Sequence, residues 1–194
     1  CLMYWLEFKN DDEFPAIFGG IGGGSALKFG IYQATSTGRW MGASGAPGGA
    51  PISLAEAIEY ATRQRDQLIE GCRLLDQLPQ DASDDDYLKL QQDLEGRLPL
   101  VGTRSWGHKY FHLIFPDKLD SFHNEDFQRF YLLKLLQMPP TDKGRYACAG
   151  RYVRLARDLD SPLAQLCRVL QDVFGSPHAY WRIDAAKLRV SGVA

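Results

Sequence analysis

The chain has 194 residues, of which 45% are hydrophobic and 12% are aromatic. This composition is typical of a globular protein and argues against general disorder. A formal net charge of −2 does not favour nucleic-acid binding, but a local basic face is enough to hold phosphates, so that partner stays open. No apolar run reaches the roughly 18 residues of a membrane span, and no cleavable leader is recognisable. We therefore expect a cytoplasmic protein that does not bind membranes.

Cysteine usage gives no sign of a disulfide framework or a zinc site. The four cysteines lie far apart and form no C-x-x-C pair, so we expect buried, reduced thiols. Because the chain starts with Cys1 rather than methionine, we also expect it to be a fragment of a longer protein.

The first 50 residues predict β structure and loops. Met3–Phe8 and Leu27–Tyr32 are rich in aromatic and β-branched residues and have the length of strands. A glycine-rich stretch at Gly19–Ser25 separates them, and a second one at Gly42–Pro51 resembles a flexible connection. We predict a twisted hairpin or a small sheet in this region.

From Pro51 onward the spacing of apolar residues changes to that of helices. Ser53 and Glu56 form a capping box, and an apolar stripe then continues to about Leu78. Asn124 is the expected cap of one later helix, and Ser161 and Pro162 are expected to open another. The further predicted helices are 84–94, 105–115, 125–138, 145–159 and 163–174, and residues 178–183 are strand-like.

These patterns predict an α+β fold, a small β element followed by a mostly helical domain. The β-rich element with its glycine-rich loops covers residues 1–50, and a domain of five or six helices covers 51–176. Residues 177–194 are expected to form a strand-like segment and a tail, the start of a linker to a missing downstream domain.

The glycine cluster and the histidines do not match the motifs that they suggest at first sight. Ser25 and Leu27 stand where G-x-G-x-x-G would need glycine, so a flexible turn is favoured over a phosphate-binding loop. His108 and His112 have the spacing of a zinc protease pair, but Lys109 replaces the required glutamate. We find no positive case for catalysis, and we expect neither a metal nor a cofactor in this chain.

The segment Trp106–Asn124 combines aromatic residues, three histidines and a Pro-Asp-Lys turn, and two interpretations of it stay open. In the first, Trp106 and its helical neighbours form a core stripe. In the second, a polar rim surrounds exposed aromatic side chains and contacts a base or a peptide. The rim would consist of Lys109, His112, Lys118 and His123.

Basic residues recur along the predicted helix 145–159. Such an edge could follow a phosphate backbone, with neighbouring tyrosines available for stacking. The alternative is a solvated helix face that pairs with Asp158 and Asp160. The candidate phosphate-binding residues are Arg145, Arg151, Arg154 and Arg157.

Several segments occur together, in the same order, in one known family: Phe18–Tyr32, Arg65–Ile69, Trp106–Asn124, Phe127–Phe130, Gly144–Tyr146 and Tyr180–Ile183. On these segments the chain resembles the N-terminal region of McrB-like AAA+ NTPases, the motor subunits of modification-dependent (type IV) restriction systems. In that family the N-terminal modules typically recognise DNA, a C-terminal motor hydrolyses nucleotide, and a separate nuclease subunit cuts. The Walker motifs are absent here, so the resemblance implies nucleotide and magnesium only in an absent motor domain.

The leading hypothesis is a non-catalytic DNA-recognition or substrate-engagement module of such an NTPase, acting in anti-phage defence. Its implied partners are DNA, with or without modified bases, and also a nuclease subunit or further copies through the missing motor. The first alternative is a helical adaptor that contacts the nuclease or a neighbouring motor subunit. The second is a DNA-modifying enzyme, such as a glycosylase or nuclease, which needs Asp117 or Asp120 to line a deep pocket.

Overall fold

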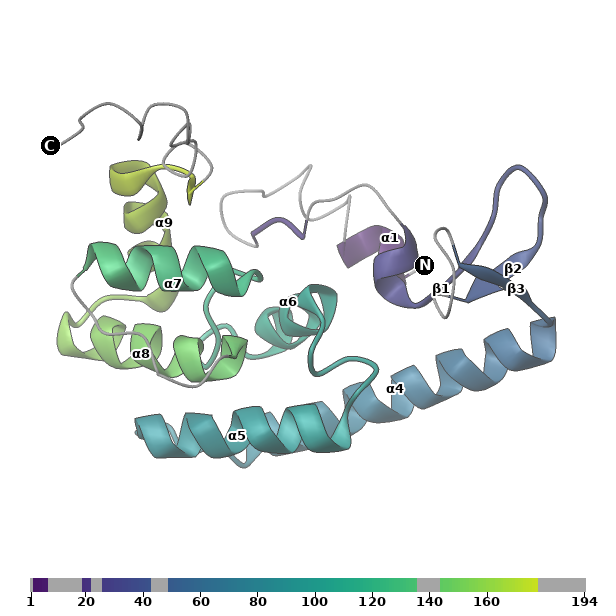
Figure 1. The fold of residues 1–194 in the computed structure, drawn as a ribbon. Helices are drawn as coiled ribbons and strands as arrows, with labels where there is room; N and C mark the ends of the chain where they lie inside the picture. The colour runs from purple at the N-terminus through teal and green to yellow at the C-terminus, as the bar shows by residue number, and fades with distance from the viewer. Residues whose placement is uncertain (1, 7–18, 22–25, 43–48, 136–143, 178–194) are drawn as a thin grey trace, which may run out of the picture.

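The computed structural model describes residues 2–6, 19–21, 26–42, 49–135 and 144–177. Its elements are mainly helices, with one small antiparallel sheet near the N-terminus, so the predicted α+β class is confirmed. Figure 1 shows the sheet at one end of the long helix α4, and helices α7, α8 and α9 at the opposite end of the molecule. None of the described helices is both long and apolar enough to cross a membrane.

The N-terminal part begins with the short helix α1 (Leu2–Tyr4) and the 3-10 helix η2 (Ala26–Phe29). Strands β1 (Ile31–Gln33), β2 (Trp40–Gly42) and β3 (Ala50–Ile52) form the sheet in the order β1-β2-β3. The pairing is antiparallel, with Tyr32 opposite Met41 and Met41 opposite Pro51.

Both predicted strands need correction. The predicted strand 3–8 is helical where the structure describes it, and only the end of the predicted strand 27–32 lies in β1. Gly30 adopts a φ of 85°, a left-handed conformation that separates η2 from β1. The predicted connection 42–51 contains the start of β3, while residues 43–48 lie outside the described residues, as do 7–18 and 22–25.

The predicted helices are all present in the described part of the chain. The bounds are α4 (Leu54–Asp76), α5 (Asp84–Arg97), α6 (Ser105–Ile114), α7 (Glu125–Lys134), α8 (Arg145–Asp158) and α9 (Leu163–Phe174). The capping box at Ser53 is confirmed, because its hydroxyl accepts from Glu56 N and its own N–H donates to the Glu56 carboxylate. Asn124 caps α7 as predicted, whereas α9 begins after Pro162 and Ser161 does not cap it.

The structure does not test every predicted boundary. The predicted C-terminal end of α7 at Met138 and the strand-like segment 178–183 both lie outside the described residues.

Two hydrophobic clusters form the core. The first joins α4, α5 and α6 around Leu75, Leu94, Trp106 and Phe111, and the second joins α7, α8 and α9. In the second cluster Phe122 stacks on Tyr131 at a centroid distance of 4.5 Å. The loop between α6 and α7 enters both clusters, through Leu119 on one side and Phe122 on the other. This loop is the structural base of the candidate site.

Candidate functional site

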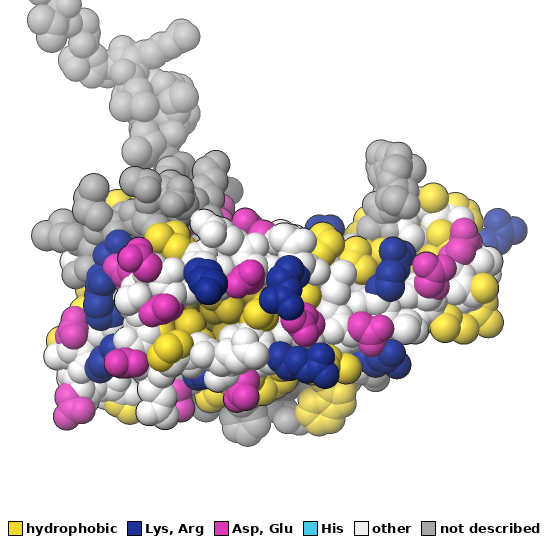
Figure 2. All heavy atoms as spheres, turned by 90° about the horizontal axis from the view of Figure 1, so that it is seen from below, with side chains coloured by type: hydrophobic (Ala, Val, Ile, Leu, Met, Phe, Trp, Pro, Cys, Tyr) yellow, Lys and Arg dark blue, Asp and Glu magenta, His cyan; other side chains and the backbone are white. Residues whose placement is uncertain are grey.

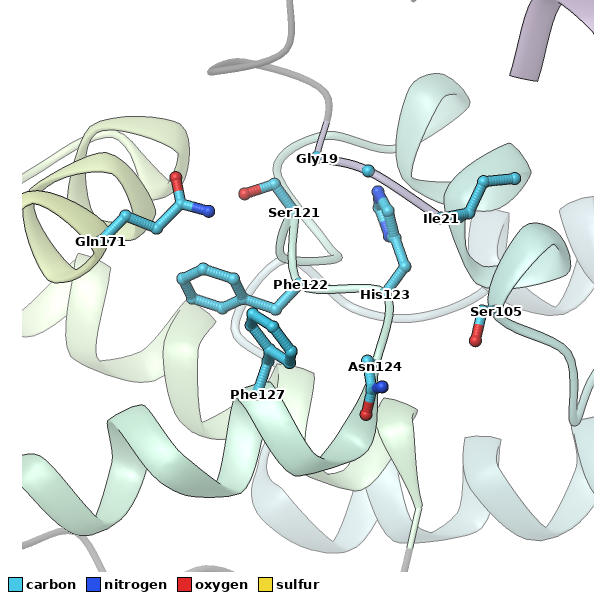
Figure 3. A pocket seen from close by; sticks show the side chains of 10 residues that line it. Gly19, Ile21, Ser105, Ser121, Phe122, His123, Asn124, Phe127 and Gln171 are labelled. Carbon is cyan, nitrogen blue, oxygen red and sulfur yellow. The ribbon is translucent and has the colours of Figure 1, made fainter. Parts of the chain in front are cut away.

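A pocket of about 480 Å³ opens beside the loop that joins α6 to α7. Figure 3 shows the side chains of Phe122 and Phe127 close together, with Gln171 of α9 on one side and Asn124 on the other. The backbone of the segment Gly19–Ile21 forms another wall. The pocket therefore combines aromatic surface with two amide side chains that can each donate and accept hydrogen bonds. The full lining is Gly19, Gly20, Ile21, Ser105, Ser121, Phe122, His123, Asn124, Phe127 and Gln171.

Gly19 makes the approach of this wall possible. It has a φ of 64°, and a Cβ placed on it would lie 2.0 Å from the carbonyl oxygen of Ser121. The close backbone contact and the left-handed conformation both require glycine. The first glycine of the cluster thus packs a loop wall against the residues that line the pocket.

Asp120 fixes the shape of the loop from inside. Its Oδ1 accepts from Phe122 N at 2.8 Å, and its Oδ2 accepts from Gln128 Nε2 at 2.7 Å. Burial raises the pKa of Asp120 to about 7, although both hydrogen bonds act in the opposite direction. Gln128 Nε2 also donates to the carbonyl of Arg145 at 3.0 Å, which ties the loop to α8.

The enzyme alternative needed a carboxylate that lines a deep pocket. Asp120 is fully buried, but its two oxygens bind the protein and it does not line the pocket. Asp120 therefore has a structural role, because it holds Phe122 and Gln128 in place.

Arg145 joins α8 to the loop and to the start of α6. Its Nε donates to the carbonyl of His123 at 3.0 Å, and its two terminal nitrogens bind the carbonyl of Thr103 at 2.7 Å and Ser105 Oγ at 3.2 Å. Each guanidinium nitrogen thus has a partner inside the protein. Arg145, predicted to hold phosphate, instead positions two residues of the pocket wall.

The three histidines of the segment are buried, and of the three only His123 lines the pocket. His108 Nδ1 lies 3.0 Å from His123 Nδ1, so one of these nitrogens donates and the other accepts. His112 Nδ1 donates to the carbonyl of Leu119 at 2.7 Å. Burial lowers the pKa of both His108 and His112, so both rings are neutral at pH 7. Among the described residues, no group of three or more metal-binding side chains is placed to hold a metal ion.

The predicted polar rim around exposed aromatic side chains is wrong for three of its four members. Lys109, His112 and His123 are at most 3% exposed. Lys109 and His112 lie on the face of α6 that packs into the core beside Trp106, whereas His123 is buried in the loop before α7. The fourth, Lys118, caps α4: its Nζ donates to the carbonyls of Leu75 and Leu78, at 2.7 and 2.8 Å. Core packing, the other interpretation of the segment, describes it better.

The remaining basic candidates lie on α8 and contact α5 and the turn before it. Arg151 and Arg154 both pair with Asp84, at 3.1 and 2.6 Å, and Arg157 donates to the carbonyl of Gln80 at 2.8 Å. The alternative interpretation predicted that these arginines pair with carboxylates, which Arg151 and Arg154 do, but it named Asp158 and Asp160 as the partners. The actual partner, Asp84, could not be found from local sequence because it lies 70 positions from Arg154. On the face seen in Figure 2, basic and acidic side chains alternate and do not form a patch of one sign.

Of the eight residues predicted to bind nucleic acid, only His123 lines the pocket. The sequence does not predict that Gly19, Phe127 and Gln171 lie close together, because they come from three segments without a shared motif. The glycine cluster predicts a flexible turn, whereas the structure packs Gly19 against the carbonyl of Ser121. Phe127 packs partly against the second hydrophobic cluster, as an ordinary core residue does, so its place in the sequence does not mark it as a site residue.

Comparisons of this chain with protein-family models, with curated proteins and with solved structures find no match.

Proposed function

We propose that this chain is a non-catalytic DNA-recognition module of a McrB-like restriction NTPase, and that the pocket beside the α6–α7 loop contacts a base. The observation that carries the proposal is the combination of Phe122, Phe127, Asn124 and Gln171 around one cavity of about 480 Å³. That volume lies in the range of small-ligand sites. Proteins that read unstacked bases combine aromatic stacking with hydrogen bonds to base edges, and this lining offers both.

The amide groups would give the pocket its selectivity. Asn and Gln each present a donor and an acceptor, the combination that reads the edge of a base. Asn124 is partly committed, because its Oδ1 caps α7 by accepting from Asp126 N at 2.8 Å. Gln171 is therefore the side chain we propose to distinguish one base, or one modified base, from another.

Phosphate contacts are proposed for Arg151, Arg154 and Arg157, which follow one edge of α8. Binding DNA would require Arg151 and Arg154 to share or leave Asp84, so these contacts compete with an internal ion pair. Solvent reaches these two ion pairs, and ion pairs that solvent reaches contribute little to stability. Phosphate can therefore compete with Asp84 for the arginines. The motor and nuclease partners of the family stay part of this proposal.

Substitutions in the pocket test the proposal. A fluorescence anisotropy titration of the chain with a short duplex should show that Phe127→Ala and Gln171→Ala each weaken binding by roughly 5- to 150-fold. One base–aromatic stack, and one good hydrogen-bonded contact to a base edge, each contribute about 1–3 kcal/mol. Gln165→Ala is the matched control, because Gln165 lies on the same helix but is exposed and does not line the pocket. Equal dissociation constants for Phe127→Ala and Gln165→Ala, with both proteins folded by circular dichroism, would remove the pocket from the proposal.

An adaptor role is the second candidate function. It is favoured by large apolar side chains that stay exposed near the sheet and along α4, among them Tyr4, Trp5, Ile58 and Ile69. Exposed apolar surface of this kind marks contact sites for other proteins when it is contiguous. In this alternative the chain contacts the nuclease or a neighbouring motor subunit, and a pull-down of those purified subunits in the absence of DNA tests it.

A further inference from the structure

A second, larger cavity of about 650 Å³ lies between the sheet and α4. Its walls are almost entirely apolar and include Phe29, Tyr32, Trp40, Leu68, Ile69 and Tyr110. Arg65 is the one charged residue in the described lining, and its guanidinium binds the carboxylate of Asp66 at 2.7 Å. The groove thus favours uncharged, apolar groups.

Strand β1 lies along this groove and, within the described residues, is an edge strand of the sheet. The turn between β1 and β2 shows which residue pairs of the two strands are hydrogen-bonded. At this turn Ala34 N donates to the carbonyl of Arg39 at 2.9 Å. Bonded pairs alternate in an antiparallel ladder, so Tyr32 and Met41 form the next bonded pair. Ile31 and Gln33 therefore direct their backbone N–H and C=O groups away from β2.

The position of Pro51 supports the same alternation of bonded and non-bonded residue pairs. If Met41 bonds to β1, then Met41 and Pro51 form a non-bonded pair, and a residue without an N–H is tolerated there. The outward side of β3 then has no donor at its centre, which is one way in which proteins protect an edge from pairing. β1 has no proline, and no described residue bonds to the outward backbone groups of Ile31 and Gln33.

We propose that this groove binds an extended, apolar peptide segment of a partner protein, which adds to the sheet as a fourth strand beside β1. The outward groups of Ile31 and Gln33 bond to the peptide backbone, and every second peptide side chain enters the groove. Because β1 has three residues, the bound core of the peptide is short, about three to five residues. This site is separate from the pocket proposed to contact DNA and does not depend on it.

The test uses the full chain and a capped peptide of alternating threonine and valine with a lysine at each end. Isothermal titration calorimetry measures its binding to wild type, Gln33→Pro and Gln33→Ala. Both variants lose the bond from Gln33 Nε2 to the carbonyl of Gly38, but only proline also removes the outward N–H. We expect Gln33→Ala to bind within twofold of wild type and Gln33→Pro to bind at least tenfold more weakly.

Two further arms separate strand addition from other contacts. Ile69→Glu places a charge in the groove at an exposed position and should weaken binding at least fivefold without loss of folding. A peptide with alternate amides N-methylated should not bind. Equal binding of the methylated and parent peptides, equal binding by Gln33→Pro and Gln33→Ala, or no binding of the parent peptide overturns the proposal. A dimer of the chain in light scattering that Gln33→Pro dissolves also overturns it, in favour of a second copy as the occupant.

Discussion

Asp120 is the residue on which the shape of the candidate pocket depends most directly. It is enclosed, it accepts two hydrogen bonds, and no described basic side chain forms an ion pair with it. Desolvation therefore outweighs the hydrogen bonds, and its pKa rises from 3.8 to about 7. The folded protein holds a proton on this carboxyl that the unfolded chain releases at a lower pH.

This difference makes stability depend on pH in a defined direction. Between pH 4 and pH 7 the folded state binds more protons than the unfolded state at this site, so the free energy of unfolding falls as the pH rises, by about 1 kcal/mol per pH unit. Asp120→Asn removes the titration. Urea unfolding at pH 5 and pH 8 should show that wild type loses stability relative to the variant at the higher pH. His108 and His112 are present in both proteins, so their titration cancels; parallel pH profiles would contradict the assignment.

Arg145 supports the pocket through three bonds and allows a second test. Arg145→Ala leaves the carbonyls of His123 and Thr103 without this donor, and we expect the free energy of unfolding to fall by roughly 2–4 kcal/mol. Arg168→Ala is the control, because Arg168 is exposed and pairs only with Asp172 on its own helix, and its loss should cost at most about 0.5 kcal/mol. Chemical unfolding at pH 7 measures both, and equal losses would show that Arg145 is not a support.

Among the elements, α5 and α8 form a close helix contact at a glycine of α8. A Cβ on Gly150 would lie 2.5 Å from Tyr87 Cγ, whereas a Cβ on Gly96 of α5 meets nothing within 4 Å. Alanine favours helices by about 1 kcal/mol over glycine at both positions. Of these two glycines, Gly150 is therefore the one at which substitution tests the close packing of α8 on α5.

Gly150→Ala should destabilise the protein by about 1–3 kcal/mol, because the added methyl group separates the two helices or displaces Tyr87. Gly96→Ala should stabilise it by about 0.5–1 kcal/mol. Thermal melting followed by circular dichroism compares the two variants. A stabilising effect of Gly150→Ala would show that the helices are farther apart than described here.

The basic edge of α8 gives a test that separates DNA binding from internal pairing. Arg151→Ala/Arg154→Ala should weaken DNA binding and lower the salt slope by about 2, one for each phosphate contact. Asp84→Asn removes the competing carboxylate and should strengthen DNA binding. Titrations at two salt concentrations measure both variants, and binding by the double variant that is unaltered at low salt would leave these arginines a structural role only.

The helices could be predicted from the sequence because their signals are local. The capping box at Ser53, the cap at Asn124 and the apolar spacing of α9 each lie within one segment, and all three segments form helices. The bounds of the N-terminal strands could not be predicted, since a high content of aromatic residues is compatible with a short helix as well as with a strand. The residues Leu2–Tyr4 and Ala26–Phe29 are the examples.

For the molecule as a whole, the candidate pocket was not predictable because its walls come from distant parts of the chain. Gly19, Asn124 and Gln171 meet only after the two hydrophobic clusters have brought α6, α7 and α9 together. The sequence pointed to the segment Trp106–Asn124, which contains the correct loop, but of the four polar residues that it nominated there only His123 lines the pocket. Lys109 and His112 face the core, while the pocket is lined by the residues that follow Asp120.

The linings of the two cavities share no residue, and we propose a different contact for each of them. The pocket beside the α6–α7 loop is aromatic and polar, as a site for a base needs to be, and the groove beside β1 is apolar. A module that binds DNA at one site and a partner protein at the other can connect recognition to a motor or nuclease. Variants of Phe127 should thus leave peptide binding unchanged, and variants of Gln33 should leave DNA binding unchanged.

The most direct measurement is a titration of the whole chain against methylated and unmethylated duplexes of one sequence, at low and at physiological salt. If the chain is a DNA-recognition module, it binds at least one duplex, with an affinity that falls as salt rises and that Phe127→Ala reduces at both salt concentrations. The absence of binding to either duplex at low salt, by a chain that is folded, would contradict the proposed function.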